Sequence, residues 1–244
     1  MRISVLTLFP EMYSGFLNCS IIGRSLERGI ASVDFVQIRD FAEDRYRHVD
    51  DTSFGGGAGM VMKCAPVKAA IDSVRTEKSC VVMMSPSGRP YTQQKAKEYA
   101  SMEHLILLCG HYEGIDARIE NYVDDIISIG DYVLTGGELA SMVVMDSVIR
   151  LQKGSIRDES TDEESYEGGL LEYPQYTKPA EWNGLKVPEV LISGNHQKIS
   201  EYRKIESLRR TRQYRPDLYE RYELSEEDKK IIRRNHLEDE FLTD

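Results

Sequence analysis

The sequence predicts an α/β domain, with a parallel sheet flanked by helices, followed by a small helical domain. Apolar runs of strand length alternate with helical patterns through the first 150 residues, and such alternation is typical of parallel βαβ units. Beyond Arg150 the chain becomes polar and acidic, and its remainder has helical patterns. We therefore predict an α/β domain over residues 1–157, an acidic interdomain linker over residues 158–170 and a helical domain over residues 171–244.

The elements of the first domain follow from hydrophobic periodicity. Each expected strand is a short apolar run, and each expected helix carries one apolar face. The expected strands are Ile3–Leu8, Val33–Ile38, Cys80–Met84, Leu105–Cys109 and Ile126–Ile129. The expected helices are Ile21–Arg28, Ala65–Val74, Thr92–Ala100, Ile115–Val123 and Gly137–Arg150, with Thr92 as an N-cap.

The C-terminal domain carries three further helix signals. They cover about Gln197–Arg212, Pro216–Glu223 and Ser225–Arg234. The last begins with Ser225-Glu-Glu-Asp, a capping-box pattern with Asp in place of Glu.

The composition is that of a globular protein, with 41% hydrophobic and 30% charged residues. No apolar stretch approaches the roughly 20 residues of a membrane span, and Met1–Pro10 is better read as a first strand than as a signal peptide. The four cysteines show neither disulfide-like nor zinc-like spacing. We therefore expect reduced thiols, a cytoplasmic location and no membrane partner.

Charge is unevenly distributed along the chain. The net charge is −10, yet residues 196–215 hold seven Lys/Arg against two Glu, whereas residues 158–172 hold seven Asp/Glu and no Lys or Arg. Tyr202 and Tyr214 are interleaved with the basic residues, which favours a surface that binds phosphates and stacks on RNA bases. The alternative is a solvated helix face.

Three glycine-bearing loops, Ser85–Pro90, Cys109–Gly114 and Ser128–Glu138, each follow an expected strand. In a parallel sheet such loops emerge at one edge, where ligands bind. Glycines let backbone groups approach a small molecule closely, so we expect a flat, hydrogen-bonding ligand such as adenine. A simple strand–turn–helix junction would explain Gly136-Gly137 alone, but not three junctions at one edge.

A long polar loop over residues 40–59 ends in Gly55-Gly-Gly-Ala-Gly59. Met60-Val61 stands where a phosphate-binding P-loop needs Lys-Ser/Thr, and the dinucleotide fingerprint is absent as well. A substrate lid or a tight turn is favoured over a phosphate cradle, and a P-loop NTPase is disfavoured.

Six motifs in order resemble bacterial tRNA (guanine-N1)-methyltransferases, of the SPOUT class, over nearly the whole chain. They are Phe54–Met62, Cys109–Gly114, Ser128–Leu139, Asp146–Arg150, Gly169–Pro179 and Val190–His196. The resemblance implies a deep trefoil knot and a homodimer with its active site at the subunit interface. It also implies transfer of a methyl group from S-adenosylmethionine to N1 of guanine 37 of tRNA, which supports reading-frame maintenance.

The resemblance also assigns residues, by motif matching. Arg150 matches a catalytic arginine. The cofactor would contact Ser85, Pro86, Gly110, Tyr112, Glu113, Ile129, Gly130, Asp131, Tyr132, Val133, Leu134, Gly136 and Gly137. The tRNA, through its anticodon stem-loop, would contact Asp50, Gly59, Ser165, Asn195, His196, Arg203 and Arg209. Magnesium is also used by such enzymes, although the sequence holds no self-evident metal cluster.

One position departs from the family pattern. The general base is an aspartate followed by Ser and an aromatic residue, whereas this chain reads Asp162-Glu-Glu-Ser-Tyr166, which puts Glu164 in that place. Glutamate keeps the carboxylate but moves it outward by one methylene, so Glu163 or Asp162 could serve instead. Two other functions stay open: a SPOUT methyltransferase acting on another RNA, and a non-catalytic RNA-binding protein that retains the cofactor pocket.

Overall fold

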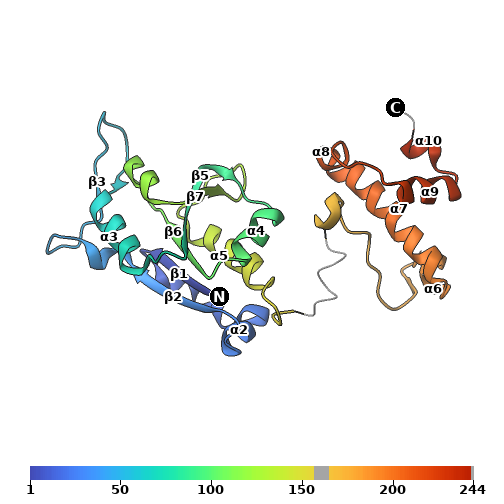
Figure 1. Cartoon of the computed structure of the whole chain (residues 1–244), viewed down its shortest axis with the longest axis horizontal. Coiled ribbons are helices and arrows are strands. Elements are labelled where there is room, and N and C mark those ends of the chain that lie inside the picture. The colour runs from blue at the N-terminus through green and yellow to red at the C-terminus, as the bar shows by residue number, and fades with distance from the viewer. Residues whose placement is uncertain (157–164, 243–244) are drawn as a thin grey trace. The chain divides into compact units, whose positions relative to one another are not determined.

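The computed structural model of the chain describes residues 1–156 and 165–242. The chain divides into two compact units, Met1–Arg157 and Asp158–Asp244, which are drawn in Figure 1 and described here one at a time. The three carboxylate candidates at positions 162–164 lie outside the described residues.

The first unit is built on a parallel sheet of five strands, in the order β2-β1-β6-β5-β7. This order confirms the predicted parallel α/β architecture, and all five expected strands are present. Their bounds are β1 Arg2–Thr7, β2 Ser32–Gln37, β5 Ser79–Pro90, β6 His104–Cys109 and β7 Asp125–Ser128.

Both faces of the sheet are buried. In the central strand β6, Leu105 and Leu107 face one apolar cluster, whereas Ile106 and Leu108 face the other. Successive side chains of a strand point to opposite faces, so an all-apolar run needs cover on both sides. This explains why these strands read as continuous apolar runs rather than as alternating ones.

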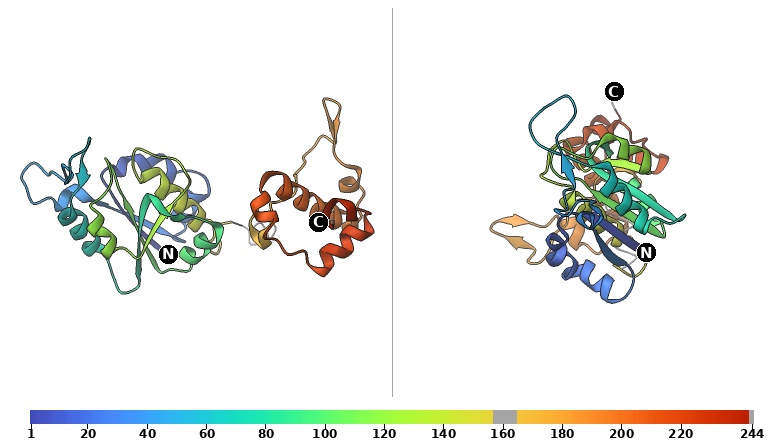
Figure 2. Two further views of the ribbon diagram at one scale, coloured as in Figure 1. Left: turned by 90° about the horizontal axis from the view of Figure 1, so that it is seen from above. Right: turned by 90° about the vertical axis from the view of Figure 1, so that its left-hand side faces the viewer.

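Helices supply that cover (Figures 1 and 2). Residues of α2 (Ser20–Glu27), α4 (Gln93–Ala100) and α5 (Glu138–Ile149) join one cluster, and residues of α3 (Cys64–Val74) join the other. Thr92 caps α4 as expected, because its Oγ1 accepts a hydrogen bond from the Lys95 N–H at 3.3 Å. The short elements of this unit are η1 Pro10–Tyr13, α1 Ser14–Leu17, η2 Ile38–Phe41, β3 Asp50–Asp51, β4 Val61–Met62 and η3 Ala117–Tyr122.

Two expected elements differ from the structure. The helix expected over 115–123 is only a 3-10 turn, η3, opened by Asp116, whose side chain accepts from the Arg118 N–H. Strand β5 runs past Met84 through a register shift, so that Arg89 and Pro90 pair with β7. A Cβ on Gly88 would stand 2.5 Å from the Ile127 backbone, so glycine is required at this irregularity in the pairing of β5 with β7.

The second unit is mainly helical, as predicted. Leu170, Leu208, Ile232 and Phe241 are among the residues of its core. The expected capping box is confirmed at Ser225, which exchanges hydrogen bonds with Asp228. The remaining bounds are η5 Glu167–Gly169, β8 Glu181–Trp182, β9 Leu185–Lys186, α6 Glu189–Ile192, α7 His196–Tyr214, α8 Pro216–Tyr219, α9 Glu226–Arg234 and α10 Glu238–Phe241.

Candidate active site

The three glycine-bearing loops converge on one cavity at the carboxyl edge of the sheet. It has a volume of about 360 Å³ and is lined by residues of all three loops. A volume of this order is sufficient for a small organic ligand. The expectation that these loops meet is therefore confirmed.

The floor of the cavity is made where the third loop returns to the second. The Gly137 N–H donates to the Gly110 carbonyl oxygen at 2.8 Å, and His111 forms a bridge with Gly136. A Cβ on Gly137 would stand 2.8 Å from Cys109 Cα. Since that neighbour is backbone of the central strand, only glycine fits, and main-chain groups are left accessible to a ligand.

The second loop is held in an unusual conformation. Tyr112 has a φ of +59°, which is uncommon for a residue with a side chain. Its hydroxyl oxygen accepts a hydrogen bond from Arg39 at 3.2 Å. The Glu113 N–H donates to the Met60 carbonyl oxygen at 3.0 Å, which joins this loop to the end of the glycine-rich segment 55–59.

The third loop closes the opposite side. Ser128 Oγ donates to the Gly130 carbonyl oxygen and accepts from the Gly130 N–H, which fixes the turn. Tyr132 and Val133 follow it, and the side chain of Val133 is 83% exposed. In the first loop, the Ser85 and Ser87 hydroxyls are hydrogen-bonded at 2.8 Å.

Twelve of the thirteen expected cofactor residues line this cavity; the exception is Asp131. Asp131 lies in the third loop and is exposed. The expected residues that line the cavity are Ser85, Pro86, Gly110, Tyr112, Glu113, Ile129, Gly130, Tyr132, Val133, Leu134, Gly136 and Gly137. Sequence reasoning missed Met83, Met84, Ser87, His111, Gly114, Ile115, Glu120, Ile127, Ser128, Thr135 and Ala140.

The lining suits an adenosine-containing ligand that carries a positively charged group. Gly110 and Gly136 line the cavity without side chains, so a ligand can approach the backbone there, and backbone N–H and C=O groups can hydrogen-bond the edge of a purine. Ile129 and Leu134 provide apolar surface for the faces of its ring. Glu113 and Glu120 provide carboxylates that suit the positively charged end of such a molecule.

Arg150 lies far from this cavity within the chain. It is the C-cap of α5, whereas the cavity adjoins the N-terminal end of the same helix at Gly137 and Ala140. A helix of 12 residues is roughly 18 Å long. The structure therefore does not bring Arg150 to the cavity of its own chain.

The remaining expected tRNA residues are spread over both units. Asp50 starts β3 and Gly59, with φ +88°, adjoins Glu113. In the second unit, Ser165 Oγ accepts from the Glu172 N–H at 3.0 Å, and Asn195 caps α7 by accepting from the Lys198 N–H at 3.1 Å.

Helix α7 places His196 and Arg203 on one hollow of the second unit. Arg203 stacks on Tyr173, with 4.7 Å from guanidinium to ring centroid. Arg209 is instead engaged by Glu240 and Glu206, and Lys204 and Arg215 are paired with Asp228 and Asp217. Much of the basic charge on this helix is thus balanced inside the unit.

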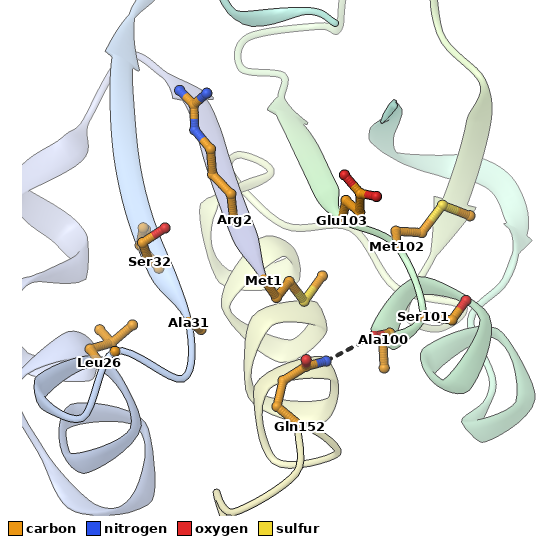
Figure 3. Close-up of a pocket in the computed structure, with 12 residues that line it drawn as sticks. Met1, Arg2, Leu26, Ala31, Ser32, Ala100, Ser101, Met102, Glu103 and Gln152 are labelled. Carbon is orange, nitrogen blue, oxygen red and sulfur yellow. Dashed lines mark hydrogen bonds between the residues drawn. The ribbon is translucent and has the colours of Figure 1, made fainter. Parts of the chain in front are cut away.

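A second hollow of the first unit, at the opposite edge of the sheet, lacks the features of a ligand site. Figure 3 shows it between the starts of β1 and β2 and the end of α4, where Gln152 donates to the Ala100 carbonyl oxygen. Arg2 on its rim forms an ion pair with Asp34, with 3.0 Å between Nε and Oδ1. We therefore assign ligand binding to the carboxyl edge.

Within the described ranges 1–156 and 165–242, no cluster of three or more His, Cys, Asp or Glu residues is arranged to hold a metal ion. Nor does any helix there combine the length and apolar character needed to cross a membrane.

Comparison with known proteins agrees with this geometry. Residues 1–221 match the family described as tRNA (Guanine-1)-methyltransferase TrmD. The chain is 54% identical to a tRNA (guanine-N(1)-)-methyltransferase of Anoxybacillus flavithermus, over 95% of this chain and 97% of that one. It is 52% identical to one of Clostridium botulinum, over 96% and 98%, and 48% identical to one of Geobacillus kaustophilus, over 96% and 97%. On this match, the chain belongs to the tRNA (guanine-1)-methyltransferase family.

Proposed function

We propose that this protein transfers a methyl group from S-adenosylmethionine to N1 of a guanine in tRNA, at position 37 beside the anticodon. The observation that carries the proposal is the convergence of the three glycine-bearing loops on one cavity, in a chain whose curated relatives are named for this activity. Methylation at this position supports maintenance of the reading frame.

The chemistry requires a base. Guanine N1 carries a proton near neutral pH and is then a poor nucleophile. The bound cofactor supplies an electrophilic methyl group on a positively charged sulfur. A carboxylate in hydrogen-bond reach of N1, which we assign to Glu164, takes the proton as the new N–C bond forms. The methyl–sulfur bond breaks in the same step and its electron pair stays on sulfur, so the neutral thioether S-adenosylhomocysteine leaves. Such a base contributes about 10²–10⁴-fold.

In this scheme Arg150 stabilises the negative charge that develops on the guanine. Loss of the N1 proton moves negative charge onto O6 of the guanine, and a guanidinium beside O6 stabilises that charge. Alignment of the two reactants by the cavity lowers the barrier further, since orientation can supply roughly 7–11 kcal/mol.

We infer that the protein is a homodimer whose active site combines two chains. The separation of Arg150 from the cavity along α5 supports this, because a partner chain can supply the arginine that each cavity lacks. Exposed apolar residues at the cavity and along α5, Val133, Leu139 and Val143, are suited to an interface. Mixing an Arg150→Ala chain with a Gly137→Ala chain should restore partial activity, since a mixed dimer has one intact site.

Four further features are proposed on the family relationship. The carboxyl end of the first unit forms a deep trefoil knot. The protein acts in the cytoplasm, in line with its four free cysteines. Magnesium participates in the reaction. The second unit binds the anticodon stem-loop through α7 and the Asn195-His196 turn.

The test is incubation with labelled S-adenosylmethionine and tRNA that lacks the modification, followed by nucleoside mapping. We expect 1-methylguanosine at position 37 and no label in a transcript whose target guanine is replaced. Label on a ribose or in ribosomal RNA would instead indicate a SPOUT enzyme with another substrate. Binding of cofactor and tRNA without any transfer would indicate a non-catalytic protein.

A further inference from the structure

Two polar side chains from different segments, one of them in the cavity lining, face the same small volume. Glu138 is the first residue of α5 and is only 2% exposed. His111, in the second loop, has a buried Nδ1 atom with no hydrogen-bond partner among the described residues. A Cβ on Gly136 would stand 2.3 Å from Glu138 Oε2 and 2.6 Å from His111 Nδ1. The two atoms are neighbours only because residue 136 has no side chain.

One oxygen of Glu138 already has a partner. Thr7, the last residue of β1, donates from Oγ1 to Glu138 Oε1 at 2.7 Å, and its oxygen accepts from the Phe9 N–H at 2.9 Å. A buried carboxylate with too few donors is unfavourable, because the desolvation cost of its charge is not recovered. Oε2 therefore needs a donor, and His111 Nδ1 is the unpartnered polar atom beside it.

The imidazole ring is held from both sides. Phe9 packs against it with ring centroids 4.9 Å apart, and Tyr112 meets it edge-on at 5.2 Å. These contacts fix the plane of the ring close to Gly136. His111 also directly precedes Tyr112 and Glu113, which line the cavity.

We propose that His111 and Glu138 are a pair of positioning residues for the cofactor loop. In this pair a small turn of the ring lets Nδ1–H of His111 donate to Oε2 of Glu138, a hydrogen bond that is not formed in the structure as described. Together with the hydrogen bond from Thr7, it links the end of β1, the start of α5 and the second loop. The pair thereby fixes Tyr112 and Glu113 at the cavity. This inference rests on the proposed function, because it assumes that the ligand of the cavity is S-adenosylmethionine.

The test is a double-mutant cycle read by calorimetric affinity for S-adenosylmethionine. We expect His111→Ala and Glu138→Gln each to weaken binding about tenfold, in line with the loss of one buried hydrogen bond to a charged group. The double variant should be weakened no further, because each single change removes the same interaction. In both variants KM for the cofactor should rise by a larger factor than kcat falls.

A conservative pair of variants separates positioning from a general packing effect. The amide nitrogen of His111→Asn stands close to the place of Nδ1, whereas that of His111→Gln reaches toward the place of Nε2. Relative to His111→Ala, we expect His111→Asn to restore most of the affinity for S-adenosylmethionine and His111→Gln to restore little. The two variants should have equal midpoints of thermal unfolding. Glu103→Gln is the matched control, because Glu103 pairs with Lys78 at the far edge of the sheet (Figure 3) and should leave binding unchanged.

Several results would overturn the inference. Losses that multiply in the double variant would show that the two residues act independently, and full affinity in His111→Ala would show that the ring is not needed. If Glu138→Gln fails to fold, the comparison of Ala, Asn and Gln at position 111 still decides. Absence of binding by the wild-type protein would overturn the proposed function itself, which is a different outcome from wild-type binding without coupling.

Discussion

Gly59 lies directly against Glu113: a Cβ on residue 59 would stand 2.4 Å from Glu113 Cγ and 2.5 Å from its Oε1. The glycine-rich segment is therefore packed onto a carboxylate that lines the cavity. Backbone hydrogen bonds of Met60 and Met62 with Glu113, Gly114 and Asp116 reinforce this contact. The segment 55–59, for which the sequence predicts a substrate lid or a tight turn, therefore packs against the second loop, Cys109–Gly114.

We predict that Gly59→Ala weakens cofactor binding whereas Gly56→Ala does not. Both glycines have a positive φ, +88° and +79°, so alanine at either position carries a backbone penalty of roughly 1–2 kcal/mol. Only residue 59 has a neighbour that must move, because nothing lies within 4 Å of a Cβ at residue 56. Calorimetry with S-adenosylmethionine and chemical unfolding of both variants measure the difference. Equal affinities would mean that Glu113 does not depend on this contact.

We predict that Glu164→Gln lowers the single-turnover rate of methyl transfer by about 10²–10⁴-fold, the usual contribution of a general base. Glu163→Gln and Asp162→Asn should retain most of the rate. All three variants should bind cofactor like the wild type, since they leave the cavity intact. A near-normal rate in Glu164→Gln would move the base to another carboxylate.

The basic helix α7 should make fewer phosphate contacts than its charge suggests, because Arg209 already donates to Glu240 at 2.8 and 2.9 Å. We predict that Arg209→Ala lowers stability by a few tenths to about 1 kcal/mol, as for partly exposed ion pairs, and leaves the salt dependence of tRNA binding unchanged. Lys198→Ala should instead reduce the slope of log affinity against log salt by about 0.7–0.9. A reduced slope for Arg209→Ala would show that this arginine leaves Glu240 to bind phosphate.

Stability should decrease as the pH falls below about 6.5, the usual pKa of an unfolded histidine. Burial lowers the pKa of His104, with nearby Arg2 acting in the same direction, so the unfolded state binds more protons in this range. His104 Nε2 is hydrogen-bonded to Ser4 Oγ at 2.8 Å. When the free energy of unfolding is measured against pH, the His104→Gln variant should show a smaller decrease below pH 6.5 than the wild type.

The neighbouring carboxylate acts in a different pH window. Burial raises the pKa of Asp34, but hydrogen bonds from Arg2 and Ser4 outweigh it, so the pKa of Asp34 is lowered overall. Its contribution to stability is lost only below about pH 4. An unchanged decline between pH 6.5 and 5 in His104→Gln would contradict the assignment to His104.

The strands of the sheet could be predicted from the sequence because the apolar patterns that mark them are local. Apolar runs such as Leu105–Cys109 are buried on both faces, and their carboxyl ends must share one edge once the strands are parallel. Where elements depend on distant partners, sequence reasoning was less successful. The extension of β5 to Pro90 depends on pairing with Ser128, and β3 forms only against β4.

The site could be predicted only to the level of its loops. Glycines at 110, 136 and 137 predict close approach of the backbone to a ligand, and this stays a prediction. The structure shows only that a Cβ on Gly137 would stand 2.8 Å from Cys109 Cα. The contact of Gly59 with Glu113 and the approach of His111 to Glu138 join segments far apart in sequence, and no local pattern encodes them. The pairing of Arg209 with Glu240 likewise depends on how α7 and α10 pack.

The most direct measurement is a calorimetric titration of the folded protein with S-adenosylmethionine. We predict saturable heat of binding that Gly137→Ala greatly reduces, because a Cβ there would press on the Cys109 backbone that borders the cavity. No heat from well-folded wild-type protein, or undiminished heat from Gly137→Ala, would contradict binding of the methyl donor at the carboxyl edge of the sheet.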